Sequence, residues 1–301
     1  MTMPREVLLS ALLGGLVADP PGIAVTGVQC DSRKVGPGDC FVALRGEKAD
    51  GLRFLADAAR RGAVVAVAEE GGAGAPLPLV RVPDARRALS RIAAAFYAEP
   101  SRRLLTVGIT GTKGKTTTSY FVESVLQAAG HRVGVLGTVS YRWPGVVAEA
   151  ARTTPESLDL QRMLSEMLLA SSTAAVMEVS SHALVQGRVA DVAFARAVFT
   201  NLASDHMDYH RTPEAYRDAK GLLFRQLGKD AVAVLNADDP MSAHYRGLTS
   251  ARVLTYGLEA PADFRARILE EAWDGTWVIL ETPAGRAEAR LKFVGRHNVQ
   301  N

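Results

Sequence analysis

The chain has 301 residues, of which 48% are apolar and 22% are charged, and its net charge is +3. This length exceeds one average domain, and the composition is that of a globular protein rather than of a disordered or fibrous chain. So small a charge, without a dense basic run, argues against nucleic-acid binding. No segment approaches the ~20 consecutive apolar residues that a membrane-spanning helix needs. Two cysteines are too few for a disulfide framework, which favours the reducing cytoplasm.

The first hundred residues predict a small α/β domain, with short apolar runs that indicate strands and helically spaced apolar residues that indicate helices. We expect strands at 23–28, 40–44, 63–68 and 79–82, and helices at 52–61 and 85–97. The apolar run after Arg5 fits a signal peptide, but the glycines and prolines between 14 and 21 favour a first amphipathic helix that ends there. Pro100 ends the last of these helices, so we place the domain boundary between residues 1–100 and 101–301.

A nucleotide site is predicted by the segment that follows. An apolar strand from Leu104 leads into the loop GTKGKTTT and then into a helical stretch. Glycines in such a loop let backbone N–H groups surround phosphate oxygens, and the helix start adds its positive end. Lys115 would contact the β- and γ-phosphates, and Thr116 would offer its hydroxyl to Mg²⁺. Ile109 stands where the general pattern has glycine, so the loop is a variant; a tight turn with a chance lysine is the alternative.

Beyond this loop, strands alternate with helices, which indicates a mostly parallel sheet with right-handed crossovers. We expect strands at 132–136, 174–179, 193–200 and 231–236, and a helix near 157–170. From Arg252 the pattern becomes β-rich, with segments that alternate by side at 277–281 and 290–294. The predicted fold class is therefore α/β: a small N-terminal α/β domain, followed by a P-loop-type central domain with a mostly parallel sheet and a β-rich extension.

Polar residues follow the predicted strands, at the sheet edge where ligands of α/β proteins bind. Glu178 ends an otherwise apolar strand, and a cation would explain the burial of a carboxylate there; a surface-facing strand residue is the alternative. In the segment DHMDYH, His206 could contact a metal ion or orient a phosphate, whereas Asp208 and His210 could equally be structural. Zinc fits these residue types, but the neighbouring phosphate loop favours Mg²⁺, which prefers oxygen ligands.

Five segments that occur in order together resemble the Mur ligases, and among them the MurE type. They are CDSRKVGPGDCFVALRGEKADG (30–51), TGTKGKTTT (110–118), MEVSSHALVQGRV (177–189), FTNLASDHMDYH (199–210) and YRDAKGLLF (216–224). The resemblance covers nearly the whole chain and includes the variant phosphate loop. It implies an ATP-dependent amide ligase of peptidoglycan precursor synthesis. The γ-phosphoryl group would pass to a carboxylate of UDP-N-acetylmuramoyl-L-alanyl-D-glutamate, and a diamino acid would attack the acyl phosphate.

The resemblance also implies roles for single residues. ATP would be bound by Gly111, Thr112, Lys113, Gly114, Lys115, Thr116, Thr117 and Asn298. The uridine substrate would be bound by Cys30, Ser32, Glu47, Lys48, Ala49, Thr153, Thr154, Ser180, Gln186 and Arg188. Two Mg²⁺ ions would be held by Thr116, Glu178, His206 and Lys220, the last of these carrying a carbamate derived from CO₂. Lys115, Lys220 and His206 would be the catalytic residues.

The carbamate sets a physical condition on Lys220. Its amine must be neutral to take up CO₂, so its pKa must lie below the usual ~10.4 because of burial or neighbouring cations. Without the resemblance, an ordinary lysine on a helix surface would be the better interpretation. The carbamate would be suited to a second Mg²⁺ because it offers two oxygens.

The chain departs from the family pattern at two places. Lys113 stands where the family commonly has asparagine, and GRHNVQN (295–301) has His297 in place of a phenylalanine, with Asn298 and Asn301 expected beside the adenine. Family members continue into a third domain that binds the amino acid, so this chain is either a fragment or lacks a complete active site, and we expect a fragment. We also expect the protein to be a monomer. The choice among meso-diaminopimelate, L-lysine and L-ornithine would be made beyond Asn301.

Two alternative functions remain at this point. One is another ligase of the Mur or folylpolyglutamate type, and the other is a non-catalytic P-loop nucleotide-binding regulator. The segments DSR and EVSSH favour the MurE type over the first alternative. Binding of the uridine substrate would separate the ligase from the regulator, since a generic nucleotide switch should ignore it.

Overall fold

The computed structural model describes residues 6–46, 50–71 and 74–301. The predicted substrate residues Glu47, Lys48 and Ala49 lie outside the described residues. The chain divides into two compact units. The first comprises residues 1–100, 156–166 and 186–192, and the second comprises residues 101–155, 167–185 and 193–301.

The first unit is built on a four-stranded, all-parallel sheet in the order β3-β4-β5-β6. Its strands are β3 (Gly27–Gln29), β4 (Asp39–Val42), β5 (Val65–Ala68) and β6 (Leu79–Arg81). Strands β4 and β5 are buried along their whole length, which explains their continuous apolar sequence. The helices are α1 (Leu9–Leu12), α2 (Leu55–Arg60) and α3 (Ala85–Phe96), with 3₁₀ turns η1 (Ser32–Lys34) and η2 (Gly51–Phe54).

The N-terminal segment is less helical than predicted. A two-residue strand, β1 (Val7–Leu8), pairs antiparallel with β2 (Ala24–Val25), and α1 has only four residues. Leu9 and Leu12 of α1 are buried in the core together with α3. Glycines at 14 and 15 oppose a longer helix because they lose the most backbone freedom on ordering.

The second unit contains an eleven-stranded sheet whose central part is parallel, as predicted. The parallel strands, in spatial order, are β8 (Val133–Leu136), β11 (Ala174–Glu178), β7 (Leu105–Thr110), β12 (Arg196–Phe199), β13 (Val232–Asn236) and β14 (Arg252–Gly257). Strand β7 therefore lies between β11 and β12, and the chain leaves it toward β8 on one side and returns to β12 on the other. The carboxyl end of β7 is thus a switch point, where ligands of α/β sheets bind.

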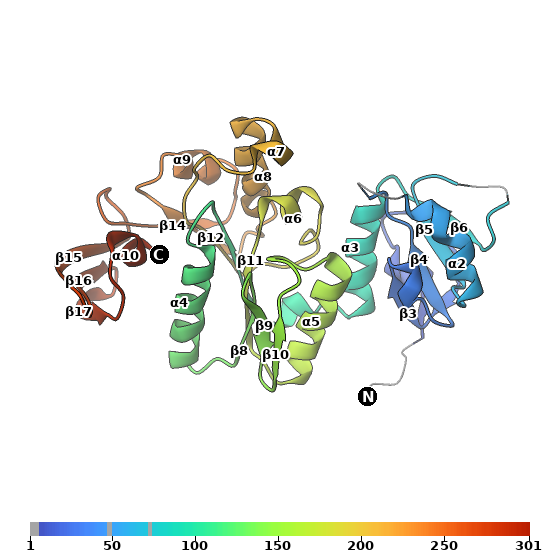
Figure 1. Cartoon of the computed structure of the whole chain (residues 1–301), viewed down its shortest axis with the longest axis horizontal. Helices are drawn as coiled ribbons and strands as arrows, with labels where there is room; N and C mark the ends of the chain where they lie inside the picture. The colour runs from blue at the N-terminus through green and yellow to red at the C-terminus, as the bar shows by residue number, and fades with distance from the viewer. Residues whose placement is uncertain (1–5, 47–49, 72–73) are drawn as a thin grey trace. The chain divides into compact units, whose positions relative to one another are not determined.

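Helices surround this parallel sheet (Figure 1). Helix α4 (Lys115–Ala128) packs on β7, β8 and β11, and its Val122 and Leu126 contact the strand core. The other helices of this unit are α6 (Ser181–Val185), α7 (Met207–His210), α8 (Pro213–Arg225) and α9 (Met241–Arg246). Helix α5 (Ser157–Leu169) belongs mostly to the first unit, and the turn η3 spans Pro100–Arg103. Helix α8 begins at Pro213, with the Thr212 hydroxyl accepting a hydrogen bond from a first-turn N–H. It packs on α6, α7 and α9 and reaches β7.

Further strands extend the sheet at both ends. One end is the antiparallel hairpin β9 (Ser140–Trp143) and β10 (Val146–Glu149), which was not predicted. The other is the β-rich extension, where β15 (Phe264–Ala272) pairs parallel with β14. Strands β16 (Gly275–Thr282) and β17 (Gly285–Leu291) then continue it in antiparallel order, followed by α10 (Arg296–Gln300). The predicted strand at 290–294 was misplaced, because β17 begins at Gly285 and ends at Leu291. The predicted fold class is confirmed.

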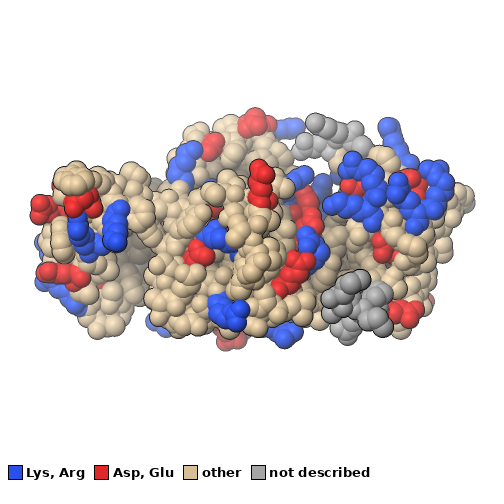
Figure 2. Space-filling view, turned by 60° about the horizontal axis from the view of Figure 1, so that its bottom comes forward, with Lys and Arg blue, Asp and Glu red and all other residues tan. Residues whose placement is uncertain are grey.

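Two further features are the distribution of surface charge and the length of the helices. On the face that Figure 2 shows, Lys and Arg side chains lie among Asp and Glu side chains. Over the described parts of the chain, no helix has the length and apolar character needed to cross a bilayer.

Candidate nucleotide and magnesium site

The loop between β7 and α4 requires both of its glycines. Gly111 and Gly114 have φ angles of 153° and 84°, which side-chain-bearing residues rarely adopt. A Cβ atom on Gly111 would also overlap the Thr200 hydroxyl, and one on Gly114 would overlap the side chain of Asn301. The loop therefore depends on these two positions for its conformation and for its close approach to neighbouring segments.

The end of β12 holds the same loop in place. The Thr112 N–H donates to the Asn201 carbonyl at 2.8 Å, and the Lys113 N–H donates to Asn201 Oδ1 at 3.0 Å. The Lys113 carbonyl accepts from Thr200 Oγ1 at 2.7 Å and from Asn201 Nδ2 at 3.1 Å. Thr200 and Asn201 thus preorganise the loop, a role the sequence did not reveal.

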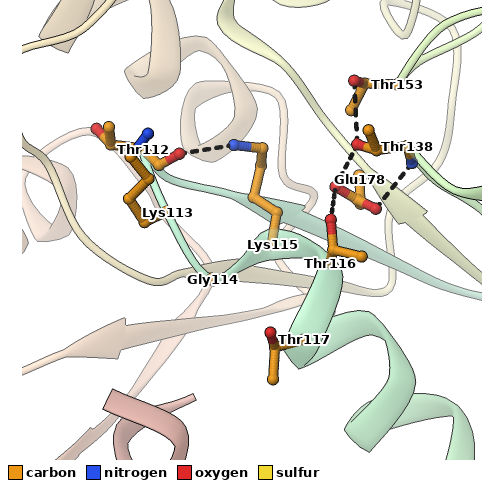
Figure 3. A pocket seen from close by; sticks show the side chains of 9 residues that line it. All are labelled: Thr112, Lys113, Gly114, Lys115, Thr116, Thr117, Thr138, Thr153 and Glu178. Carbon is orange, nitrogen blue, oxygen red and sulfur yellow. Dashed lines mark hydrogen bonds between the residues drawn. The ribbon is translucent and has the colours of Figure 1, made fainter.

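A pocket of about 230 Å³ opens above this loop. Figure 3 shows the side chains that line it, which come from the loop, the start of α4 and the carboxyl ends of neighbouring strands. They belong to Thr112, Lys113, Gly114, Lys115, Thr116, Thr117, Thr138, Thr153 and Glu178. Six consecutive residues of the predicted ATP-binding loop therefore share one pocket with the predicted metal ligand Glu178.

Glu178 is a buried carboxylate, only 1% exposed. Its Oε2 accepts from Thr116 Oγ1 at 2.9 Å and from Thr138 Oγ1 at 3.0 Å, and its Oε1 accepts from the Thr138 N–H at 2.9 Å (Figure 3). A carboxylate and two hydroxyls are hard oxygen donors of the kind that Mg²⁺ prefers. Thr138 was missed in the sequence, although its place just after β8 follows the same rule that singled out Glu178.

Two lysines contact the loop from its inner side. The Lys115 ammonium donates to the carbonyls of Gly111 and Thr112 at 2.9 and 3.0 Å. Lys220, 1% exposed, donates to the same Gly111 carbonyl at 2.9 Å, and its Nζ lies 4.3 Å from the centre of the Tyr216 ring. Burial lowers the pKa of Lys220 well below its usual value, and the charge of Lys115 lowers it further. The interpretation of Lys220 as an ordinary surface lysine is therefore wrong.

The histidine segment lies beside these lysines. His206 adopts a left-handed backbone with φ of 55°, and its ring lies 5.1 Å from that of His182 and 6.1 Å from that of Tyr216. It is not among the residues that line the pocket. His210 is buried and its Nε2 lies 2.9 Å from Ser181 Oγ, while burial lowers its pKa. This contact favours the structural alternative for His210.

No group of three His, Cys, Asp or Glu side chains suited to a metal ion occurs in the described ranges. Nothing in those ranges therefore supports the zinc alternative. Mg²⁺ differs, because it commonly takes only one or two protein ligands and completes its shell with water and substrate phosphates. The donors around Glu178 fit that mode of binding.

The predicted uridine-substrate residues fall into both units. In the second unit, the hydroxyls of Thr153 and Thr138 lie 3.1 Å apart, Thr154 Oγ1 donates to the Glu178 carbonyl at 2.8 Å, and the Ser180 N–H donates to Thr154 at 3.1 Å. These three residues are therefore tied to the strand end that carries Glu178.

The remaining predicted substrate residues belong to the first unit. Arg188 is 8% exposed, pairs with Glu156 at 3.1 Å and bonds to Gln186. Ser32 is buried, and burial raises the pKa of the Cys30 thiol to about 11, so that thiol is neutral at pH 7. Glu156 was not recognised in the sequence as a partner of Arg188.

At the end of the chain, the two asparagines have different surroundings. Asn298 Nδ2 donates to the Val294 carbonyl at 2.8 Å, within its own turn. Asn301, in contrast, packs its side chain against Gly114. Of the two, the structure brings Asn301 to the phosphate loop.

A glycine-rich loop at the switch point of a parallel sheet, with lysines and a buried carboxylate around it, defines a P-loop-type nucleotide-binding protein. The sequence matches the Mur ligase middle domain over residues 109–301 and the catalytic domain of the Mur ligase family over residues 24–97. The chain belongs to the Mur ligase family.

Individual relatives agree with this assignment. The chain is 44% identical over 305 residues to the UDP-N-acetylmuramoyl-L-alanyl-D-glutamate–2,6-diaminopimelate ligase of Geobacillus thermodenitrificans (strain NG80-2), covering 99% of this chain and 62% of the relative. It is 42% identical over 285 residues to the ligase of the same name from Listeria monocytogenes serotype 4b (strain F2365), covering 93% and 58%. A solved structure of a ligase of that name superposes with a TM-score of 0.85 at 27% identity, covering 98% and 62%. The chain thus spans about three fifths of the length of these relatives.

Proposed function

We propose that this chain carries the uridine-substrate and ATP sites of a UDP-N-acetylmuramoyl-L-alanyl-D-glutamate–2,6-diaminopimelate ligase, acting in the cytoplasm as a monomer. The first unit would contribute Cys30, Ser32, Gln186 and Arg188 to the uridine substrate, and the second unit would bind ATP. Sequence identity above 40% to two ligases of this name supports the substrate. It also favours 2,6-diaminopimelate over lysine or ornithine as the amine.

The proposed reaction consists of two consecutive displacement steps. A carboxylate oxygen of the D-glutamyl residue attacks the γ-phosphorus of ATP, the bond to the β,γ-bridging oxygen breaks, and ADP leaves. The amine nitrogen of the diamino acid then attacks the acyl carbon, loses a proton and expels phosphate. Phosphoryl transfer needs mainly positioning and charge neutralisation, which suits a site of backbone N–H groups, lysines and a carboxylate.

One observation carries the proposal: Glu178 and Lys220, from β11 and α8, both reach the short loop that begins at Gly111. Glu178 accepts from Thr116 at the start of α4, and Lys220 donates to Gly111. A plain tight turn has no need of a buried carboxylate on one side and a buried amine on the other. Glu178 lines the pocket above this loop, and Lys220 contacts the loop itself, which supports a triphosphate and its metal ions as the ligands.

Magnesium and the carbamate fit these residues. Thr116, Thr138 and Glu178 offer oxygen donors, and the lowered pKa of Lys220 increases the fraction of its amine that is neutral. Its nitrogen would attack the carbon of CO₂, forming an N–C bond while one C–O π bond opens onto oxygen, and one N–H proton would be released to leave an anionic carbamate. When bound, Mg²⁺ neutralises developing charge on the phosphates. His206 would contact a metal ion or orient a phosphate near Lys220.

The first test asks whether ATP and the uridine substrate bind at separate sites. We expect Lys115→Ala to abolish ATP binding while UDP-N-acetylmuramoyl-L-alanyl-D-glutamate binds as to the unaltered chain, measured by calorimetry. Lys229→Ala, on an exposed lysine outside the pocket, is the matched control. If the chain binds ATP and ignores the uridine substrate, the nucleotide-binding regulator is the better account. Loss of both ligands in Lys115→Ala would contradict separate sites.

The first chemical step has its own test. In ATP labelled with ¹⁸O at the β,γ-bridge, reversible acyl-phosphate formation moves the label into non-bridging β positions. We expect this exchange to require the uridine substrate and Mg²⁺ but no diamino acid. Exchange without the uridine substrate would indicate an ATPase instead of a ligase.

A further inference from the structure

Lys113 is a member of the phosphate loop whose charged side chain the proposed reaction does not use. Its backbone is fixed by three hydrogen bonds to Thr200 and Asn201. Its side chain, in contrast, is 79% exposed and lines the pocket on the Thr112 side of the loop, away from Glu178 (Figure 3). The backbone of Lys113 is therefore fixed, and only its side chain can change its partner.

The partner of Lys113 is an acidic residue from another segment. Lys113 Nζ lies 3.6 Å from Asp205 Oδ2, in the segment that connects β12 to α7. Asp205 Oδ1 accepts from the N–H of His206 at 3.0 Å, and His206 Nε2 lies 3.9 Å from Oδ2. The usual pKa of an aspartate side chain is ~3.9, so Asp205 is anionic at pH 7.

The negative charge of Asp205 affects how a triphosphate binds at the loop. A triphosphate bound on the loop brings several negative charges toward Asp205, and like charges repel. The same ligand offers Lys113 charge-assisted hydrogen bonds that are stronger than a solvent-exposed ion pair. Both effects favour transfer of the Lys113 ammonium from Asp205 to the phosphates.

We propose that Lys113 is a second phosphate-binding lysine, which Asp205 holds at the edge of the pocket until a nucleoside triphosphate displaces it. Lys113 touches the ligand, whereas Asp205 is a positioning residue that competes with the ligand for the lysine. Displacement leaves Asp205 with His206 as its neighbour, so nucleotide entry is coupled to the segment that carries a candidate metal ligand. The inference rests on the proposed function only in that the loop binds ATP.

The test measures nucleotide affinity in variants of each partner. Titrations with ATP, ADP, AMP and inorganic tripolyphosphate, with and without Mg²⁺, would be made on Lys113→Asn, Asp205→Asn and the double variant. Lys229→Asn, at an exposed site outside the pocket, is the matched control. All variants would first be compared with the unaltered chain in thermal unfolding.

Lys113→Asn should weaken ATP and tripolyphosphate binding by about three- to tenfold, with a smaller effect on ADP and none on AMP. Asp205→Asn should tighten ATP binding by about two- to fivefold, and increasingly so at low salt. The double variant should lie close to Lys113→Asn alone, because most of the effect of Asp205 passes through the lysine and only its screened repulsion of the phosphates remains. An asparagine that merely loosens the fold would not tighten a ligand.

Three results would overturn the inference. Unchanged ATP affinity in Lys113→Asn would show that the lysine does not contact phosphate. Weaker ATP binding in Asp205→Asn that appears only with Mg²⁺ would make Asp205 a metal ligand instead of a competitor. Additive effects in the double variant would mean that the two residues act independently. If the unaltered chain failed to bind ATP, the proposed function itself would fail, which is a distinguishable outcome.

Discussion

Lys115 and Lys220 donate hydrogen bonds to the same oxygen atom, the main-chain carbonyl of Gly111, each at 2.9 Å. Two ammonium groups on one acceptor repel each other, and burial disfavours the charged form of both. Lys220 is the more buried, and its pKa is lowered further by Lys115. This difference between the two lysines supports the proposal that Lys115 binds phosphate as a cation and Lys220 reacts as a neutral amine.

The first prediction concerns the cost of burying Lys220. Its pKa is lower in the folded than in the unfolded chain, so between these values the unfolded chain binds more protons. Stability should therefore rise with pH across that window. Lys220→Met, which keeps the length of the side chain, should remove this rise and stabilise the chain at pH 7 by about 1 kcal/mol or more. Urea unfolding in CO₂-free buffer measures both effects.

Lys229→Met is the control for that measurement, because Lys229 is exposed. It should change the free energy of unfolding by no more than about 0.5 kcal/mol. A Lys220→Met variant that is less stable at pH 7, with the pH dependence retained, would show that burial of the Lys220 charge does not destabilise the fold.

The second prediction separates backbone strain from steric overlap at the phosphate loop. Gly114 and Gly130 have nearly equal φ angles of 84° and 87°, but only at Gly114 would a Cβ atom meet a neighbour, the side chain of Asn301. Gly130→Ala should cost about 1 kcal/mol from strain alone. Gly114→Ala should cost more and should also weaken ATP binding. Equal losses of stability, with ATP binding intact, would mean that Asn301 does not pack against the loop.

The third prediction concerns Thr138, which donates twice to the buried carboxylate of Glu178. Thr138→Val removes the hydroxyl donor and should cost about 1–2 kcal/mol of stability, because a buried acceptor loses a partner. It should also raise the Mg²⁺ concentration needed for ATP binding. Thr153→Val, whose hydroxyl lies near Thr138, is the control and should affect Mg²⁺ less. The reverse order of effects would remove Thr138 from the metal environment.

The fourth prediction concerns the contact between α6 and α7. His210 Nε2 lies 2.9 Å from Ser181 Oγ in a buried setting. A double-mutant cycle with Ser181→Ala and His210→Ala should give a coupling energy of about 1 kcal/mol. The lowered pKa of His210 means that the unfolded chain binds more protons below the usual histidine pKa, so stability should fall as the solution is acidified. Additive single effects at pH 8 would show that the contact is incidental.

How far the sequence predicted this molecule can be judged from particular residues. The strand, glycine loop and helix around Gly111 and Gly114 were predictable because only glycine adopts their backbone angles. Glu178 was predictable because burying a carboxylate in an apolar strand costs free energy unless a cation or hydrogen-bond donors compensate for it. The burial of Lys220 did not follow from its own helical spacing, which does not reveal that α8 turns it into the core; only the family resemblance singled this lysine out.

Other features depended on contacts between distant segments. Thr138 reaches Glu178 across 40 positions of the sequence, and Lys113 meets Asp205 far along the chain. The hairpin β9–β10 could have been found from Pro144 and Gly145, whose dipeptide marks a tight turn between two short segments. The roles of Thr200 and Asn201 in holding the loop could not, because they need the register of β12 beside β7.

The most direct measurement of the central claim is ¹³C NMR of the chain equilibrated with ¹³C-labelled bicarbonate and CO₂. The claim that Lys220 is the reactive neutral amine predicts one carbamate carbon signal, which Lys220→Gln abolishes and Lys115→Gln retains. The signal should also strengthen when Mg²⁺ and ATP are added. Absence of the signal, or its persistence in Lys220→Gln, would contradict the division of tasks between the two lysines on Gly111.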